Sequence, residues 1–138
     1  MAFGTLKFDT LTTSDAKNTS TEKSIDTSYV LNGVAKSWWQ YDQANTTTDG
    51  SFNVSSISDD STGIYTPTLI NSQSSITDRC VNLTTNHNDG ETNPRVSCLR
   101  FDKGGSYTTS AITAQVWQSH YYVRDCRHNF GSVLGGLA

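Results

Sequence analysis

Three residues in the last quarter of the chain have the types that serve nucleophilic catalysis. Ser119 and His120 are adjacent, and Asp125 follows shortly after them. A Ser-His-Asp hydrolase also needs its nucleophile on a strained turn beside an oxyanion hole, and the G-x-S-x-G pattern of one such turn does not occur in the sequence. We therefore predict that these are polar residues at strand ends, and that the protein is not an enzyme.

Two further groups have residue types that bind ions or phosphates. Consecutive acids such as Asp59 and Asp60 point in different directions on a strand, and the D-x-D-x-D-G pattern of a calcium loop is absent. Gly104 and Gly105 follow Lys103, but this is not the order of a phosphate-binding loop. We expect a solvated turn at the two acids and no phosphate site at the two glycines.

The three cysteines, Cys80, Cys98 and Cys126, are odd in number and widely spaced. A structural zinc site needs four ligands, usually with closely spaced cysteine pairs. The nearest approach to such a cluster is Cys126 with His120 and His128. The pattern predicts three reduced thiols that act as small buried hydrophobic residues, with no metal and no cofactor.

The composition favours β-structure. Ser and Thr make up more than a quarter of the 138 residues, and only 34% of the residues are hydrophobic. Thr, Val, Tyr and Trp suit pleated surfaces, and 5 Phe, 3 Trp and 6 Tyr supply enough apolar surface for a core. We predict an all-β protein, a small antiparallel sandwich or barrel-like domain. Because its apolar supply is thin, we also expect it to self-associate.

Charge and hydropathy exclude two classes of partner. The net charge of −3 and the absence of a long basic run give no general attraction to nucleic acid or to an anionic membrane. No apolar stretch approaches the ~20 residues of a membrane-spanning helix. The first residues lack the basic start and apolar run of a secretory signal, so we expect synthesis in a cytoplasm.

The chain divides into an extended N-terminal arm over residues 1–28 and a β-domain over residues 29–138. Within the arm, Leu6 and Phe8 alternate with polar residues, and a long polar run follows. Turn signals recur about every 8–12 residues in the rest of the chain, as in a sandwich or barrel. The expected elements are a hairpin of residues 52–54 and 65–69 around a turn at 58–63, a polar loop at 43–50, strands at 76–84, 96–101, 111–117 and 120–127, and a docking tail at 130–138.

Aromatic residues are the candidates for contact with other molecules. On a strand, Trp39 and Tyr41 share one face and Trp38 takes the other, so we expect both faces to be covered, in part by another subunit. Stacking on sugar rings is the alternative role of such residues, and we favour packing. The predicted assembly residues are Leu6, Phe8, Trp38, Trp39, Tyr41, Phe130 and Leu134. The predicted receptor contacts are Tyr107, Tyr121 and Tyr122.

Four sequence blocks in residues 5–70 carry a family resemblance. They read LKFDTL at residues 6–11, LNGVAKSW at 31–38, SFNVSSISD at 51–59 and TGIYT at 62–66. In this order they resemble a family of small virion proteins of tailed bacteriophages, common among phages of marine bacteria and described as tail fibre or structural proteins. No comparable block occurs from Arg79 onward.

The resemblance implies a non-enzymatic virion protein, made in the cytoplasm of a host bacterium. It implies a homotrimer whose arm attaches to other virion proteins of the tail, portal region or capsid, and whose β-domain projects. As a tail or head fibre component, the protein would contribute to host adsorption by contacting a surface glycan or protein of the host.

Two alternatives remain open. The apolar tail at residues 130–137 suits a decoration or cement protein that stabilises the particle without binding a receptor. A polysaccharide depolymerase is the third hypothesis, but such enzymes need long β-helices or paired acidic groups in a groove, and the chain has only Glu22 and Glu91 as glutamates.

Overall fold

The computed structural model of the chain describes residues 10–12, 24–26, 33–86, 95–100, 108–118 and 122–137. The elements that these ranges contain in full are all β-strands, which confirms the predicted all-β class. They are β1 (Thr10–Thr12), β2 (Ser24–Asp26), β3 (Ser37–Asp42), β4 (Thr47–Phe52), β5 (Val54–Ser61), β6 (Ile64–Leu69), β7 (Arg79–Asn86), β8 (Arg95–Leu99), β9 (Ala114–Gln118), β10 (Tyr122–Val123) and β11 (His128–Gly135).

The chain forms two compact units, Met1–Val34 and Ala35–Ala138. In the first unit, β1 and β2 form an antiparallel pair in which Leu11 lies opposite Ile25. The predicted assembly residues Leu6 and Phe8 lie outside the described residues. The extended arm over residues 1–28 therefore stays a prediction.

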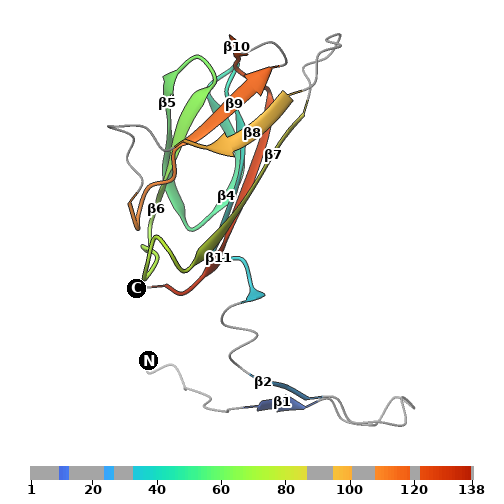
Figure 1. The fold of residues 1–138 in the computed structure, drawn as a ribbon, viewed down its shortest axis with the longest axis vertical. Helices are drawn as coiled ribbons and strands as arrows, with labels where there is room; N and C mark the ends of the chain where they lie inside the picture. Colours follow the sequence, from blue (N-terminus) through green and yellow to red (C-terminus); the bar gives the residue numbers. More distant parts are fainter. Residues whose placement is uncertain are drawn as a thin grey trace, which may run out of the picture. The chain divides into compact units, whose positions relative to one another are not determined.

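The second unit is a sandwich of two antiparallel sheets, as predicted (Figure 1). One sheet has four strands in the order β4-β3-β11-β7. The other has the order β10-β9-β6-β5, and β8 pairs with β9 as its fifth strand. Strands that are distant in sequence are neighbours in both sheets, so neither sheet can form from local contacts alone.

The predicted hairpin is confirmed, but its turn is shorter than expected. Strands β5 and β6 pair with Val54 opposite Leu69, and β5 continues through Ser61. The turn is therefore Thr62-Gly63 alone. Gly63 has a φ of 68°, and a Cβ there would lie 2.6 Å from the Arg124 backbone nitrogen, so both conformation and space require glycine.

Three other expectations are corrected. The segment 43–50 is not one loop, because β4 begins at Thr47. The strand expected at 120–127 is only the short β10 in the described residues. The apolar segment that we expected to dock as a tail is β11, which pairs with β3 on one side and β7 on the other. Phe130 and Leu134 thus belong to a central strand of the sandwich.

The core lies between the two sheets. Trp39 and Tyr41 reach it from β3 and Val133 from β11, while Tyr65 reaches it from β6. The Tyr41 and Tyr65 rings meet with centroids 5.4 Å apart and planes tilted by 44°, which joins the two layers. The remaining buried members are Leu69, Ile112, Ala114, Val116 and Cys126.

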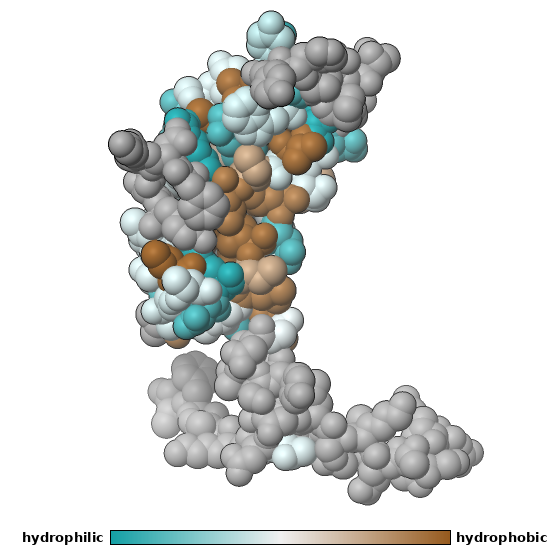
Figure 2. All heavy atoms as spheres, viewed as in Figure 1, coloured by the Kyte–Doolittle hydropathy of each residue, from teal (hydrophilic) through white to brown (hydrophobic). Residues whose placement is uncertain are grey.

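A hydrophobic stripe is visible along one side of the sandwich, where β7 and β8 approach each other (Figure 2). Val81 and Leu83 of β7 and Leu99 of β8 are partly buried and pack against the core. These three residues of β7 and β8 therefore extend the core at its margin.

Candidate functional site

Of Ser119, His120 and Asp125, which we expected to be polar residues at strand ends, the structure describes only Asp125. The Asp125 carboxylate accepts a 2.6 Å hydrogen bond from the Gly63 backbone N–H. The backbone carbonyl of Asp125 accepts another 2.6 Å hydrogen bond from the Arg95 guanidinium. Ser119 and His120 lie outside the described residues. Asp125 thus anchors the β5–β6 turn.

The acidic pair Asp59-Asp60 also has structural partners. Gln43, which is 1% exposed, donates from Nε2 to Asp59 at 3.0 Å and to the backbone oxygens of Ser61 and Ile64. Asp60 accepts from the Thr66 hydroxyl. Both acids lie on β5 and not in the turn that we expected, and each joins β5 to a neighbouring segment. The run Lys103–Gly105 lies outside the described residues.

The cysteines are free and differ in burial. Cys126 is buried in the core as expected, Cys98 is half-buried, and Cys80 is exposed, contrary to the prediction. Within the part of the chain that the structure describes, no group of three or more His, Cys, Asp or Glu residues could hold a metal ion.

The outer face of the four-stranded sheet is the candidate site. Because side chains alternate along a strand, the residues next to the buried Trp39 and Gly131 point away from the core. The register then places them in cross-strand rows. One row is Phe52, Trp38, Ser132 and Asn82, from β4, β3, β11 and β7. The next row is Gly50, Gln40, Phe130 and Thr84.

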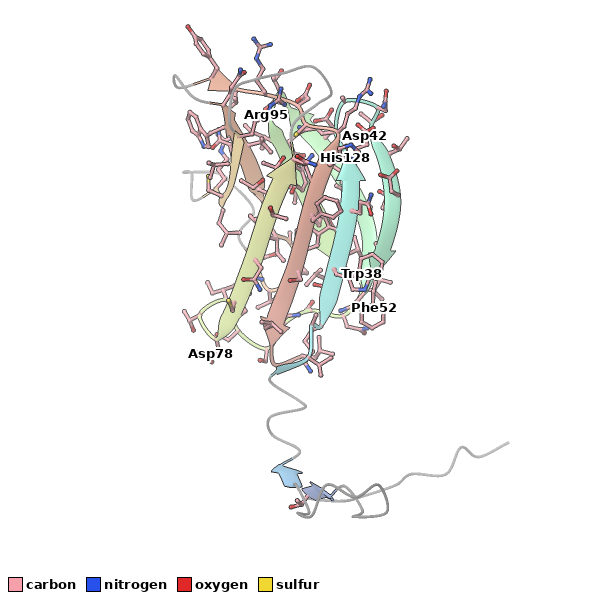
Figure 3. All side chains as sticks on the ribbon, turned by 90° about the vertical axis from the view of Figure 1, so that its right-hand side faces the viewer. Trp38, Asp42, Phe52, Asp78, Arg95 and His128 are labelled. Carbon is pink, nitrogen blue, oxygen red and sulfur yellow. The ribbon has the colours of Figure 1, made fainter. Side chains whose placement is uncertain are left out.

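Large aromatic side chains are exposed on this face. Phe52 is 55% exposed, Trp38 44% and Phe130 37%. Figure 3 looks onto this sheet and shows Trp38 and Phe52 next to each other, with Asp42 and His128 near the opposite end of the strands. Leu134, on the same outward side of β11, is half-buried.

A hollow of about 310 Å³ opens between these side chains. Ser132 has a short side chain and lies between Trp38 and Asn82 in its row, which leaves space above the strand. Phe130 and Thr84 bound the hollow in the next row. The lining residues are Trp38, Trp39, Asn82, Leu83, Thr84, Phe130, Gly131 and Ser132. None of them carries a formal charge.

The Trp38 indole packs against the neighbouring strand β4 at Gly50. Two atoms of its six-membered ring lie 3.3 and 3.4 Å from the position that a Cβ of Gly50 would take. Because glycine has no side chain, the ring can rest against β4. Gln40, beside it, donates to the Asp49 carboxylate at 3.3 Å. The exposed indole therefore has a defined position on the sheet.

The inner face of the same sheet has the opposite character. Burial, aided by the charges of Asp59 and Asp125, raises the pKa of Tyr41 to about 12. Tyr65 faces Tyr41 from β6 of the other sheet, and burial raises the pKa of Tyr65 to about 12 as well. The Trp39 indole N–H opposes part of this rise in Tyr65, although the two groups lack the geometry of a full hydrogen bond. These tyrosines are core groups and not candidates for acid–base chemistry near neutral pH.

The predicted assembly residues thus fall into two groups. Trp39 and Tyr41 are each 1% exposed and lie in the core of their own chain, so their burial needs no second subunit. Trp38 and Phe130 are exposed on the outer face of the single chain, and the predicted contact of Trp38 with another subunit stays a prediction. Phe52, Asn82 and Ser132 could not be selected from the sequence, because only the register across β4, β3, β11 and β7 brings them beside Trp38.

A second, smaller aromatic surface lies on the other sheet. Trp117 is 37% exposed and lies opposite Val96, which is 63% exposed. Of the predicted receptor contacts, Tyr122 on β10 is 65% exposed, and Tyr107 and Tyr121 lie outside the described residues. The hollow beside Trp38 is not on this surface.

Comparisons with known proteins give no match: no protein-family model, no curated protein and no solved structure is similar to this chain. No helix within the described residues is long and apolar enough to cross a membrane.

Proposed function

We propose that this protein is a structural component of a tailed bacteriophage virion, a tail or head fibre subunit that contributes to host adsorption. The observation that carries the proposal is the difference between the two faces of the four-stranded sheet. One face of the four-stranded sheet builds the core, and the other displays Trp38, Phe52 and Phe130 around a hollow. A displayed aromatic face on a rigid sheet is suited to binding an external partner.

The resemblance to phage proteins supports the same proposal. Its blocks at residues 31–38, 51–59 and 62–66 fall on the start of β3, on β4 and β5, and on the turn into β6. These segments form the framework of the sandwich and contribute Trp38 and Phe52 to its outer face. In this proposal, residues 1–28 attach a homotrimer to other virion proteins, and the sandwich meets a host surface glycan or protein.

The hydrogen bonds of the acidic residues support a non-enzymatic role. Asp59, Asp60 and Asp125 are each engaged in hydrogen bonds that join strands or turns. The candidate hollow has no acid, base or nucleophile stronger than the hydroxyls of Ser132 and Thr84. Binding, without cleavage, is the chemistry that this surface supports.

A decoration or cement protein is the second candidate, but the apolar tail that first suggested it is part of the sandwich. Residues 130–137 do not form a separate docking tail, because β11 is a central strand. The exposed aromatic side chains could instead pack against a neighbouring capsid subunit, which is the observation that keeps this candidate.

Localisation in purified phage particles separates the two candidates. Gold-labelled antibody against this protein should mark the tail or a head fibre, and particles made without the protein should assemble but adsorb to host cells more slowly. Labelling spread over the capsid lattice, with lower particle stability and normal adsorption, would favour decoration. Purified particles that lack the protein altogether would contradict both.

A further inference from the structure

We propose that the hollow between Trp38 and Phe130 is a binding site for a neutral sugar ring. The proposal rests on the function proposed above and names the chemical class of the receptor. The site combines an exposed indole, a second aromatic ring and three polar side chains on adjacent strands of one sheet.

The aromatic part of the site suits one face of a pyranose. The C–H groups on that face carry partial positive charge and pack against the negative face of an aromatic ring. Trp38 is 44% exposed, and its ring rests against Gly50, so it needs little ordering when a ligand arrives. Phe130 lies diagonally across β3 and β11, where such pairs are about 7–8 Å apart and large rings can still reach a common ligand.

The polar part of the site suits sugar hydroxyl groups. A hydroxyl both donates and accepts hydrogen bonds, and so do the Asn82 amide and the Ser132 and Thr84 hydroxyls. Asn82 and Thr84 are exposed on β7, and Ser132 is half-buried between Asn82 and Trp38. A concave apolar surface with a few convergent polar groups is the usual form of a small-molecule site, and about 310 Å³ lies at the lower end of the usual range. This volume suits a mono- or disaccharide.

The charge of the lining argues for a neutral ligand. No lining residue is ionisable, and Asp49, which precedes Gly50 on β4, accepts a hydrogen bond from Gln40. A carboxylated or sulfated sugar would lose its hydration there without gaining a cationic partner from the lining. A second copy of the chain is the competing occupant. The hollow above Ser132 favours a ligand that enters it over a flat sheet-to-sheet contact.

The test uses the full chain and three neutral disaccharides, maltose, lactose and N,N′-diacetylchitobiose, with sialyllactose as the charged comparison. Binding is followed by backbone amide shifts in NMR titrations. At least one neutral sugar should shift the signals of β3, β7 and β11, and sialyllactose should not bind more tightly than lactose. Trp38→Ala and Ser132→Leu, which remove the platform and fill the hollow, should each weaken binding by about tenfold or more.

Trp117→Ala is the matched control, because Trp117 has a similar exposure of 37% on the other sheet. It should bind the sugar as the wild type does. Amide spectra establish that each variant is folded, and Ser132→Leu tests the site even where Trp38→Ala disturbs the sheet.

Three results would overturn the inference. They are no binding of any of the three neutral sugars, unchanged binding by Trp38→Ala and Ser132→Leu, and a wild-type oligomer that Trp38→Ala converts to a monomer. The last result would show that a second copy covers the face. Sugar binding by a protein absent from phage particles would leave this inference standing and remove only the proposed function.

Discussion

Two adjacent tryptophans lie on opposite faces of the four-stranded sheet and differ in exposure. Trp39 is 1% exposed, and its indole lies so close to Gly131 that a Cβ there would be 2.0 Å from Cζ2. Trp38 is 44% exposed, and its indole lies beside Gly50, where a Cβ would be 3.3 Å away. Each ring lies against a glycine of a neighbouring strand. The inner ring is locked into a core, whereas the outer ring is only supported from below.

Two neighbouring residues of β3 therefore have different roles: Trp39 stabilises the fold, and Trp38 is available to bind a ligand. A side chain packed on all sides contributes mainly to folding, because any change leaves a cavity or a clash. A supported but exposed ring contributes little to folding and remains available to a ligand. Substitutions on the inner face should therefore lower the stability of the fold, and substitutions on the outer face should weaken ligand binding.

The largest effect is expected for Trp39→Ala on the inner face. It removes a large side chain from between the two sheets, and we expect it to lower the free energy of unfolding by about 3–5 kcal/mol. Urea denaturation measures the change. A loss below about 1 kcal/mol would mean that Trp39 is not part of the core.

Gly131→Ala should be almost as damaging. The added methyl group meets the Trp39 ring, and overpacking of this kind costs about 3 kcal/mol. A double-mutant cycle locates the cause, since the cost of Gly131→Ala should fall when Trp39 is already alanine. Equal costs in both backgrounds would show that the backbone, and not the ring, requires glycine.

High pH should weaken the core between the two sheets as well, through Tyr65 of the facing sheet. Tyr65 ionises at a pKa of about 12 in the fold and near 10 when unfolded, so the unfolded chain releases its proton first as pH rises. The stabilisation is complete below about pH 10 and is lost as pH rises toward 12, by about 2–3 kcal/mol for this residue. Unfolding followed against pH by tyrosinate absorbance measures it. Ionisation of all tyrosines near pH 10 in the folded protein would contradict the packing described here.

Trp38→Ala on the outer face should change stability by less than about 1 kcal/mol, because the side chain is substantially exposed. Trp39→Ala provides the comparison in the same denaturation experiment. If the two substitutions cost the same, the outer face is covered by another chain and the contrast between the faces is lost.

The smallest effect on folding is expected for Gly50→Ala, within about 0.5 kcal/mol. The Cβ would displace the Trp38 ring by a few tenths of an ångström without entering the core. We expect weaker sugar binding in the NMR titration with little change in unfolding. Unchanged binding would show that Gly50 does not position the indole.

Local patterns were sufficient to predict much of the fold. Alternation placed Trp39 and Tyr41 on one face and identified the β5–β6 hairpin, because both depend on neighbours in sequence. The central position of β11 could not be predicted. A glycine-rich segment such as residues 130–138 has a weak strand signal, and only Trp39 on a distant strand explains why Gly131 must be small.

The candidate site was even less accessible from sequence. Trp38 was identified as notable, but Asn82 and Ser132 become its neighbours only through the pairing of β3, β11 and β7. These strands are far apart along the chain, so no local pattern reports their register. The exposure of Trp38 likewise depends on what covers the sheet, which alternation alone does not determine.

Binding of the purified Trp38→Ala protein to host cells tests the central claim most directly. We predict that this variant, with an unfolding free energy within about 1 kcal/mol of wild type, loses about tenfold or more of its cell-binding affinity. Wild-type binding by the folded variant would contradict the claim that this outer face is the recognition surface.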